Sequence, residues 1–212
     1  MAPDLPVDLT PAKLPDDALA DGSVHVALAF ADLDLSGAEA AGVEVDQCSL
    51  RSVDLSGTTM RRWLIRDARL ERCDLANVRA RDCDLSRVAI VSSRMTGLSW
   101  VDGRLRDVTF TDCRMDLASF RSSRFSDVVF SGCRLTQAEF GDADLGGARF
   151  ENCDLTGAQF SAAKMVGTRL VGCDLTGIDG VTSLRGAVIT SGDARALAAT
   201  LAVALGITIE DE

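Results

Sequence analysis

Apolar positions repeat every five residues over most of the chain. From Phe30 to Leu175 every fifth residue is large and apolar, and only Ala40 and Ala80 break this rule among thirty positions. The residue two places earlier is usually small, and the other three are mainly polar. This period matches neither an amphipathic helix, with about 3.6 residues per turn, nor a flat strand. It indicates a short-period solenoid, whose units bury their inward side chains only by stacking on one another.

Units such as CDLTGAQF at residues 153–160 and CDLTG at residues 173–177 resemble the pentapeptide-repeat family, whose signature is A(D/N)LXX. The resemblance covers residues 28–178 without a break in phase. It implies an all-β fold, a right-handed quadrilateral β-helix in which four units form one turn and two residues per unit point inward. With turns about 4.8 Å apart, the units would make roughly 7.5 turns and a shaft about 36 Å long.

Residues twenty apart should then share a face of the shaft, and the sequence agrees. Glycine or asparagine recurs at this spacing, which predicts corners with positive φ. These residues are Gly37, Gly57, Asn77, Gly97, Gly157 and Gly177. Leu117 and Gln137 interrupt the column and leave the corner geometry there open. Trp63 falls at a small inward position, so we expect a bulge or an outward side chain within residues 61–65, whereas Trp100 falls at a large position.

The two ends differ from the repeat. Residues 1–27 contain all four prolines and are predicted to form an N-terminal cap or arm, residues 28–178 the β-helix, and residues 179–212 a C-terminal helical cap and dimerisation module. Ser191 is a candidate N-cap, with a short α-helix over residues 194–205 that ends at Gly206.

The C-terminal helix is apolar nearly all round, and an element that is apolar on two sides normally has a second partner. We therefore predict a homodimer through this end, the alternative being a buried cap on a monomer. The predicted interface residues are Leu197, Leu201, Val203, Leu205, Ile207 and Ile209. The tail also resembles that of the Qnr and MfpA branch of the family, in which a C-terminal helical module joins two β-helices.

Candidate chemistry is sparse. All seven cysteines occupy the small inward position, so we interpret them as core spacers rather than metal ligands or nucleophiles. With no export signal, they favour a cytoplasmic protein with reduced thiols, and no apolar run is long enough to span a membrane. His25, in the predicted cap, is assigned a structural role. We expect no enzyme, no catalytic residues, no metal and no cofactor, because no nucleotide-binding or hydrolase motif is present and a filled coil leaves no internal pocket.

One outward column carries charges of both signs. Aspartates of the D-L-S/T-G turns are interrupted by Arg94, Arg114 and Arg134. The aspartates are Asp34, Asp54, Asp74, Asp154 and Asp174. Two interpretations stay open: the carboxylates accept hydrogen bonds from turn amides, or they form an acidic strip that faces a partner.

Charge shapes the choice of partner. A net charge of −10 argues against direct nucleic-acid binding. The resemblance to Qnr and MfpA types implies a DNA mimic that occupies DNA gyrase and protects it from fluoroquinolones. However, residues 28–178 hold 22 acidic and 19 basic side chains, a net of only −3, and residues 51–130 are net positive with 15 basic and 11 acidic groups. Two hypotheses follow. The chain is a gyrase modulator, or it is a protein-interaction scaffold that binds an unrelated target through mixed-charge faces and the patch of Arg94, Arg114 and Arg134.

Overall fold

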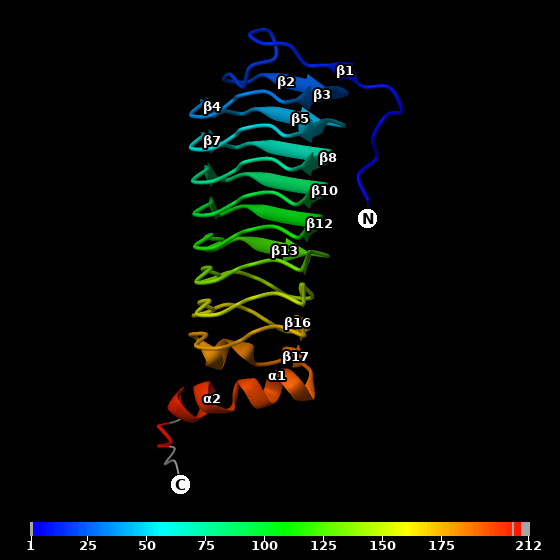
Figure 1. The fold of residues 1–212 in the computed structure, drawn as a ribbon. Coiled ribbons are helices and arrows are strands. Elements are labelled where there is room, and N and C mark those ends of the chain that lie inside the picture. Colours follow the sequence, from blue (N-terminus) through cyan, green and yellow to red (C-terminus); the bar gives the residue numbers. More distant parts are fainter. Residues whose placement is uncertain (1, 205, 209–212) are drawn as a thin grey trace.

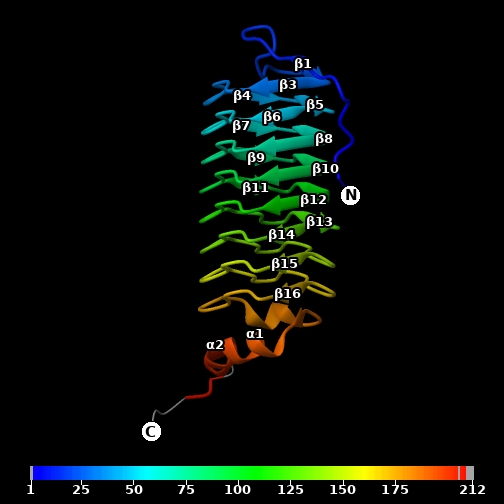
Figure 2. The same cartoon turned by 45° about the vertical axis from the view of Figure 1, so that its right-hand side comes forward.

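The computed structural model describes residues 2–204 and 206–208 and shows a single stack of parallel strands from the N-terminal end to a pair of helices (Figure 1). Strand partners are twenty residues apart, as in Leu85 with Leu105 and Phe110 with Phe130. Turned by 45°, the same stack shows a second wall of strands (Figure 2). The quadrilateral, all-β coil expected from the sequence is therefore confirmed.

Most strands are short because corners interrupt them after a few residues, whereas β8, β10 and β12 continue for eight residues through the corners at Asp67, Arg87 and Asp107. One sheet has 13 strands and a second has four, in the order β11-β9-β7-β4. The strands are β1 (Thr10–Pro11), β2 (Val24–Val26), β3 (Leu28–Ala31), β4 (Glu39–Ala41), β5 (Glu44–Asp46), β6 (Ser49–Arg51), β7 (Thr59–Arg61), β8 (Leu64–Glu71), β9 (Arg79–Arg81), β10 (Asp84–Val91), β11 (Ser99–Val101), β12 (Arg104–Thr111), β13 (Arg124–Ser126), β14 (Val129–Ser131), β15 (Arg149–Glu151), β16 (Arg169–Val171) and β17 (Val188–Ile189).

The coil is longer than the repeat phase suggested, with about nine turns instead of seven and a half. At the N-terminal end β2 pairs with β5 in the same register as the later turns, and His25 lies beside Val45. At the other end β17 pairs with β16. His25 therefore belongs to an inward column of the coil and not to the cap in which the sequence analysis placed it. Strands pair through their backbones, so the coil can continue beyond the residues that follow the apolar repeat. The repeat alone therefore did not predict the pairing of β2 and β17.

The corners adopt left-handed backbone conformations, as predicted for the glycine and asparagine column. Gly57 has a φ of 66° and Asn77 one of 57°. Leu117 and Gln137, where the sequence left the geometry open, adopt the same conformation with φ values of 58° and 55°. An ordinary side chain in this region costs about 1–2 kcal/mol. The stacked turns above and below therefore impose the corner even where the residue disfavours it.

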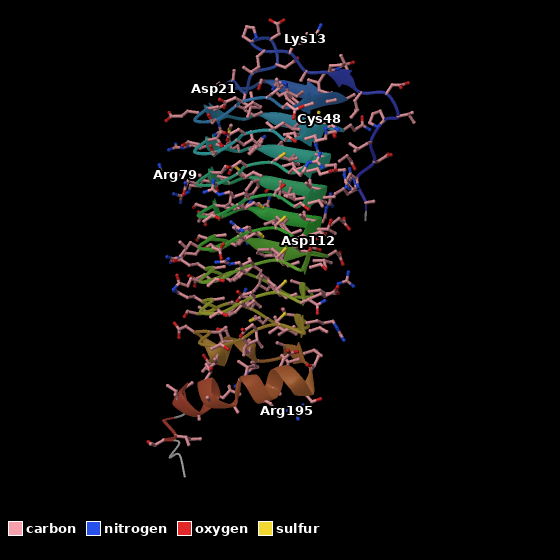
Figure 3. The ribbon with its side chains drawn as sticks, in the orientation of Figure 1. Lys13, Asp21, Cys48, Arg79, Asp112 and Arg195 are labelled. Atoms are coloured by element: carbon pink, nitrogen blue, oxygen red, sulfur yellow. The ribbon has the colours of Figure 1, made fainter. Side chains whose placement is uncertain are left out.

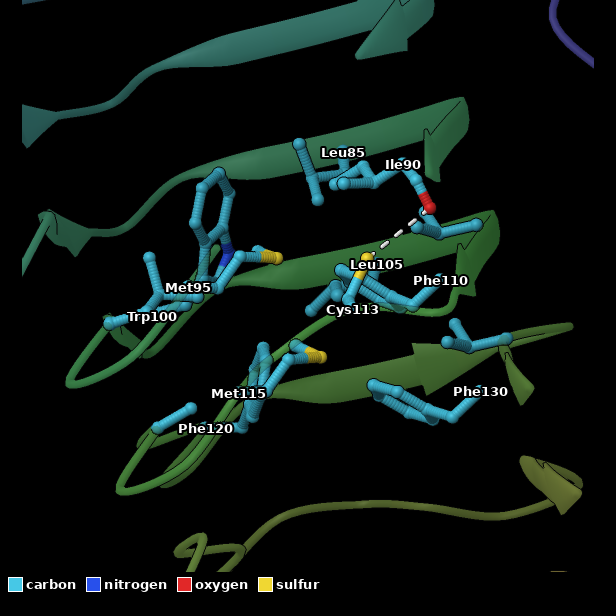
Figure 4. Packing of buried hydrophobic residues seen from close by; sticks show 14 of the residues in the cluster. Leu85, Ile90, Met95, Trp100, Leu105, Phe110, Cys113, Met115, Phe120 and Phe130 are labelled. Atoms are coloured by element: carbon cyan, nitrogen blue, oxygen red, sulfur yellow. Dashed lines mark hydrogen bonds between the residues drawn. The ribbon is translucent and has the colours of Figure 1, made fainter. Parts of the chain in front are cut away.

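Phenylalanine rings fill the C-terminal half of the core in two ladders. Phe110, Phe130 and Phe150 stack with centroids 4.7 and 4.8 Å apart. A second ladder through Phe120 and Phe140 meets the first edge-on. Figure 4 shows Phe110 and Phe130 of the first ladder and Phe120 of the second. The ring spacing equals about one strand separation, so each turn adds one ring to each stack.

The expected bulge at Trp63 is wrong. Its side chain is only 1% exposed and the parallel register continues on both sides of it. Trp63 and Trp100 lie two turns apart with their rings 6.3 Å from each other, and the turn between them contributes Ala80 and Cys83 to the same columns. The small Ala80 thus leaves the space that the indole of Trp63 occupies, and the backbone stays regular.

The C-terminal end is closed by a 3-10 helix, Val181–Leu184, and two short helices, α1 (Ser191–Ala196) and α2 (Ala198–Ala204). The N-cap is Thr190 and not Ser191: its hydroxyl accepts a hydrogen bond from the Asp193 amide, and the Asp193 carboxylate accepts one from the Thr190 amide. This reciprocal pair places the N-cap one residue earlier than expected, and α1 begins at Ser191 and not at residue 194. Over the described residues, no helix is long and apolar enough to cross a membrane.

Candidate protein-binding surface

The interior of the coil is filled by its own side chains, so any binding site lies on the outside. The small inward position is held by groups that satisfy neighbouring backbone atoms. The Sγ of Cys133 donates to the carbonyls of Ser131 and Phe110, and Ser93 and Ser123 use their hydroxyls in a comparable way. All seven cysteines are buried free thiols, and burial raises the pKa of Cys83 to about 11. The raised pKa makes the Cys83 thiol a poor nucleophile, and the burial of all seven cysteines fits their interpretation as core spacers.

The five aspartates of the D-L-S/T-G turns all have a local role. Each carboxylate accepts a hydrogen bond from the amide two residues later, at 2.8–3.0 Å. The hydrogen bonds from Ser36 hold the pKa of Asp34 below its usual value, and those from Thr156 do the same for the pKa of Asp154. The turn-capping interpretation thus has direct geometric support. Partner binding by these carboxylates stays a prediction.

We call the complete column of eight residues the banded column. It reads three carboxylates, three guanidinium groups and two carboxylates, and parallel bridges join successive members. Its members are Asp34, Asp54, Asp74, Arg94, Arg114, Arg134, Asp154 and Asp174. Arg94 contacts Asp74 at 3.0 Å and Arg134 contacts Asp116 at 2.6 Å. In the described part of the chain, Arg114 has no ion pair.

Charge along the whole chain follows the same order. Residues 1–50 carry 10 acidic and 1 basic side chains, a net of −9. Residues 51–138 carry 16 basic and 11 acidic, a net of +5, and residues 139–212 carry 11 acidic and 5 basic, a net of −6. The shaft is therefore acidic at both ends and basic in the middle, which is a patchwork and not a continuous negative stripe.

Arginines also gather on the four-stranded sheet. Arg61, Arg79 and Arg81 project from β7 and β9 around a shallow hollow of about 320 Å³ over Ala80. Arg79 points outward from the shaft in Figure 3. Arg81 contacts Asp102 at 3.1 Å. This face adds to the basic middle of the shaft and offers hydrogen-bond donors to an acidic surface.

The N-terminal arm runs beside the first turns of the coil (Figure 1) and is tied to a partly buried charge pair. The Asp4 amide donates to the Asp67 carboxylate at 3.2 Å, and Arg87 binds the same carboxylate through two nitrogens. The Arg87 guanidinium holds the pKa of Asp67 below its usual value. The repeat pattern could not reveal this pair, because both residues occupy polar corner positions.

The C-terminal end exposes apolar side chains. Leu197 is 1% exposed and packs onto the core, whereas Leu201, Val203 and Ile207 are 37%, 77% and 55% exposed. A hollow of about 470 Å³ lies between α2 and the last turn, lined by residues that include Ile178, Val181 and Val203. Two residues of the predicted interface, Leu205 and Ile209, lie outside the described residues.

Candidate chemistry within the coil is confined to structural contacts. His25 is buried, its Nε2 lies 3.0 Å from the Ser23 hydroxyl, and its ring meets Phe30 edge-on. Across the described residues, no group of three His, Cys, Asp or Glu side chains could hold a metal ion. The features that remain for function are the charged faces of the shaft and the apolar C-terminal end.

These features define a parallel β-solenoid with charged outer faces. A family model described as pentapeptide repeat region matches residues 63–140 and 91–160. Together with the unbroken five-residue register, this match identifies the coil as a pentapeptide-repeat region. A search of curated proteins finds no match.

Solved structures of similar fold include three that illustrate the range of the family. HetL, involved in heterocyst differentiation regulation in Nostoc sp. strain PCC 7120, is 21% identical over 81% of this chain and 91% of its own, with a TM-score of 0.38. Full-length QnrB1, a plasmid-mediated fluoroquinolone resistance protein, is 20% identical over 84% and 99%, with a TM-score of 0.39. A thylakoid lumen protein of Arabidopsis thaliana is 22% identical over 63% and 68%, with a TM-score of 0.32.

Proposed function

We propose that this chain is a non-catalytic binding protein that recognises other proteins through its charged faces. The observation that carries the proposal is the combination of a filled interior with an ordered surface of acidic and basic blocks. A filled coil leaves no place for a substrate, whereas blocks of charge steer and select protein partners. The buried free thiols suit a reducing compartment, so we place the protein in the cytoplasm.

The apolar end suits a second copy of the chain. Exposed Val203 lines the hollow beside α2 and Leu201 is exposed on the same helix, so a two-fold contact there would cover apolar surface on both copies. Sedimentation velocity of the full chain tests this contact. A Val203→Glu variant should lower the sedimenting mass toward that of the 22.5 kDa chain, while Val7→Glu, at a fully exposed position of the N-terminal arm, should not. Equal masses for all three proteins would reject the end-to-end contact.

The test of partner choice is a pull-down that compares charge variants. The wild-type chain serves as bait in a lysate of its source organism, beside a variant in which Arg61, Arg79 and Arg81 are changed to Ser. A partner that recognises the basic middle should be lost from the variant and from wild type at high salt, because exposed charge pairs are screened over about 3–10 Å. Capture that is indifferent to both changes would contradict the proposal.

DNA gyrase is the particular partner that the sequence resemblance suggests, with protection from fluoroquinolones as the consequence. The acidic residues 139–212, next to the proposed junction of two copies, favour it. The basic middle opposes it, since duplex DNA carries about one negative charge per 1.7 Å. A supercoiling assay with gyrase from the source organism decides: inhibition, or rescue from drug-induced cleavage, supports gyrase, and no effect on either activity leaves an unrelated target.

A further inference from the structure

The banded column carries charges that are complementary to their own reversed order. Its first six members are three carboxylates followed by three guanidinium groups. When a second copy is laid against this face upside down, every carboxylate meets a guanidinium group. We propose that two copies of the chain pair side by side through the banded column, with antiparallel long axes, about a two-fold axis that passes between Asp74 and Arg94.

The symmetry of this pairing fits the regular spacing of the coil. A two-fold axis parallel to the strands keeps the strand direction and sets each column opposite itself in the partner. Because both copies repeat at about 4.8 Å, the match holds along the whole contact. The pairs are Asp34 with Arg134, Asp54 with Arg114 and Asp74 with Arg94, each formed twice.

The corner column beside the charges is complementary in shape. The same rotation sets Leu117 opposite Gly57 and Gln137 opposite Gly37. Leu117 is 56% exposed and holds a backbone conformation that favours glycine, with a φ of 58°. A Cβ atom added at Gly57 or Gly37 would meet no atom within 4 Å in its own chain, so space is open at both glycines. The two bulky corner residues thus face the two open ones.

The arginines of the banded column have no turn-capping role that would explain them. Each aspartate of the column satisfies the amide two residues later, and an arginine cannot accept that bond. An aspartate at residue 94, 114 or 134 would therefore serve the local turn better. The second pair out from the proposed axis, Asp54 with Arg114, joins two groups that have no ion pair within the described chain. A second copy supplies the missing partner for both.

The test uses the full chain with Val203→Glu, so that end-to-end contact and side-by-side contact are separated. Sedimentation equilibrium should show association at low salt that weakens as salt rises. Arg114→Asp sets two carboxylates against each other, as Asp54→Arg does for two guanidinium groups, and each should weaken association at least about tenfold. An equimolar mixture of the two variants should associate again, because each restores the opposite charge to the other.

A steric variant tests the same contact without a change of charge. Gly57→Asn introduces a residue that the corner already accepts at Asn77, and should abolish association while circular dichroism and thermal unfolding stay as in the parent. Gly42→Asn is the matched control, since Gly42 has the same conformation and open surroundings at a different corner. A parent that stays monomeric at every salt concentration, or association that survives both Gly57→Asn and Arg114→Asp, would overturn the proposal.

Discussion

The two halves of the core follow one repeat but are filled in different ways. From Phe110 to Phe160 the large positions are mostly phenylalanine, and rings stack at nearly constant spacing. Toward the N-terminus the large positions include a histidine, a tryptophan and two alanines, and a second tryptophan, Trp63, occupies a small position. The five-residue repeat therefore decides which positions point inward. The side-chain volume is balanced between neighbouring turns, so a residue that is too large in one turn is matched by a small one in the next.

The largest effect is expected where the filling is uniform. Phe130 stacks on Phe110 and Phe150 and meets Phe120 and Phe140 edge-on. Phe130→Ala should lower the free energy of unfolding by about 3–5 kcal/mol, because rings above and below hold the cavity open. Urea denaturation followed by circular dichroism measures the change. Phe130→Leu keeps most of the apolar volume and should cost less than half as much, and equal losses would show that the stacked ring itself, and not the lost volume, dominates the effect.

The second prediction concerns the N-terminal half of the core, where large and small side chains alternate between turns. A Cβ atom at Gly103 would lie 2.4 Å from the Trp100 Nε1 and 2.5 Å from the Cys83 carbonyl oxygen. Gly103 has no side chain because the indole of Trp100 lies there and donates to that carbonyl at 3.2 Å. Gly103→Ala should therefore cost about 1–3 kcal/mol through overpacking, measured by the same denaturation.

A double variant isolates the cause of that loss. If the indole of Trp100 is the obstacle, Gly103→Ala combined with Trp100→Phe should be more stable than the sum of the two single changes predicts, by about 0.5–3 kcal/mol. Ser123→Ala, at the small inward position one turn after Gly103, is the control for the effect of changing a small side chain in this column. Strict additivity at Gly103 and Trp100 would mean that the Cys83 carbonyl, and not the ring, forbids the side chain.

The five-residue register, which needs only residue size, predicted a solenoid, and the resemblance to the pentapeptide-repeat family implied the quadrilateral coil. Sequence reasoning failed at Trp63, since the rule treated each position alone, whereas the space comes from Ala80 in the next turn. Both residues were visible as exceptions, and their spacing of 17 could have linked them. It also placed His25 in the cap, because a histidine does not match the apolar repeat. In the structure β2 nevertheless continues the strand pairing, with His25 at the inward position.

The candidate surface was predicted less completely than the fold. The aspartate turns followed from their motif, and each carboxylate indeed meets an amide. The pair of Asp67 and Arg87 did not follow, because outward positions carry no size rule and their contacts depend on rotamers. Charge order in the banded column was readable from the sequence, but its match to the reversed order needs the coil geometry that sets residues twenty apart in line.

A smaller effect distinguishes the two tryptophans. In the described part of the structure the Nε1 of Trp63 is buried without a hydrogen-bond partner, whereas that of Trp100 donates to Cys83. Trp63→Phe removes an unsatisfied donor, which offsets part of the lost apolar contact. Trp100→Phe removes the hydrogen bond to the Cys83 carbonyl. It should therefore lower the free energy of unfolding, measured by urea denaturation, by about 0.5–1.5 kcal/mol more than Trp63→Phe does. The opposite order would indicate that a partner satisfies Trp63.

The smallest effect lies at the first inward position of the N-terminal half. Burial lowers the pKa of His25 below its ordinary value of 6.5, with Asp17 acting in the opposite direction. The folded chain therefore resists protonation, and between the two pKa values the unfolded chain binds more protons. Stability should be constant above about pH 6.5 and fall as the pH drops from there toward the folded-state pKa.

His25→Leu should flatten this dependence, because leucine suits the column that continues through Val45 and Ile65. Urea midpoints at about pH 7.5 and about pH 5.5 measure it, and this window excludes the aspartates, whose ordinary pKa lies near 3.9. The phenylalanine half contains no titrating side chain in its ladders, so Phe130→Leu should keep the wild-type pH slope. An unchanged slope in His25→Leu would mean that the acid sensitivity arises elsewhere, and the contrast between the halves would then be one of volume alone.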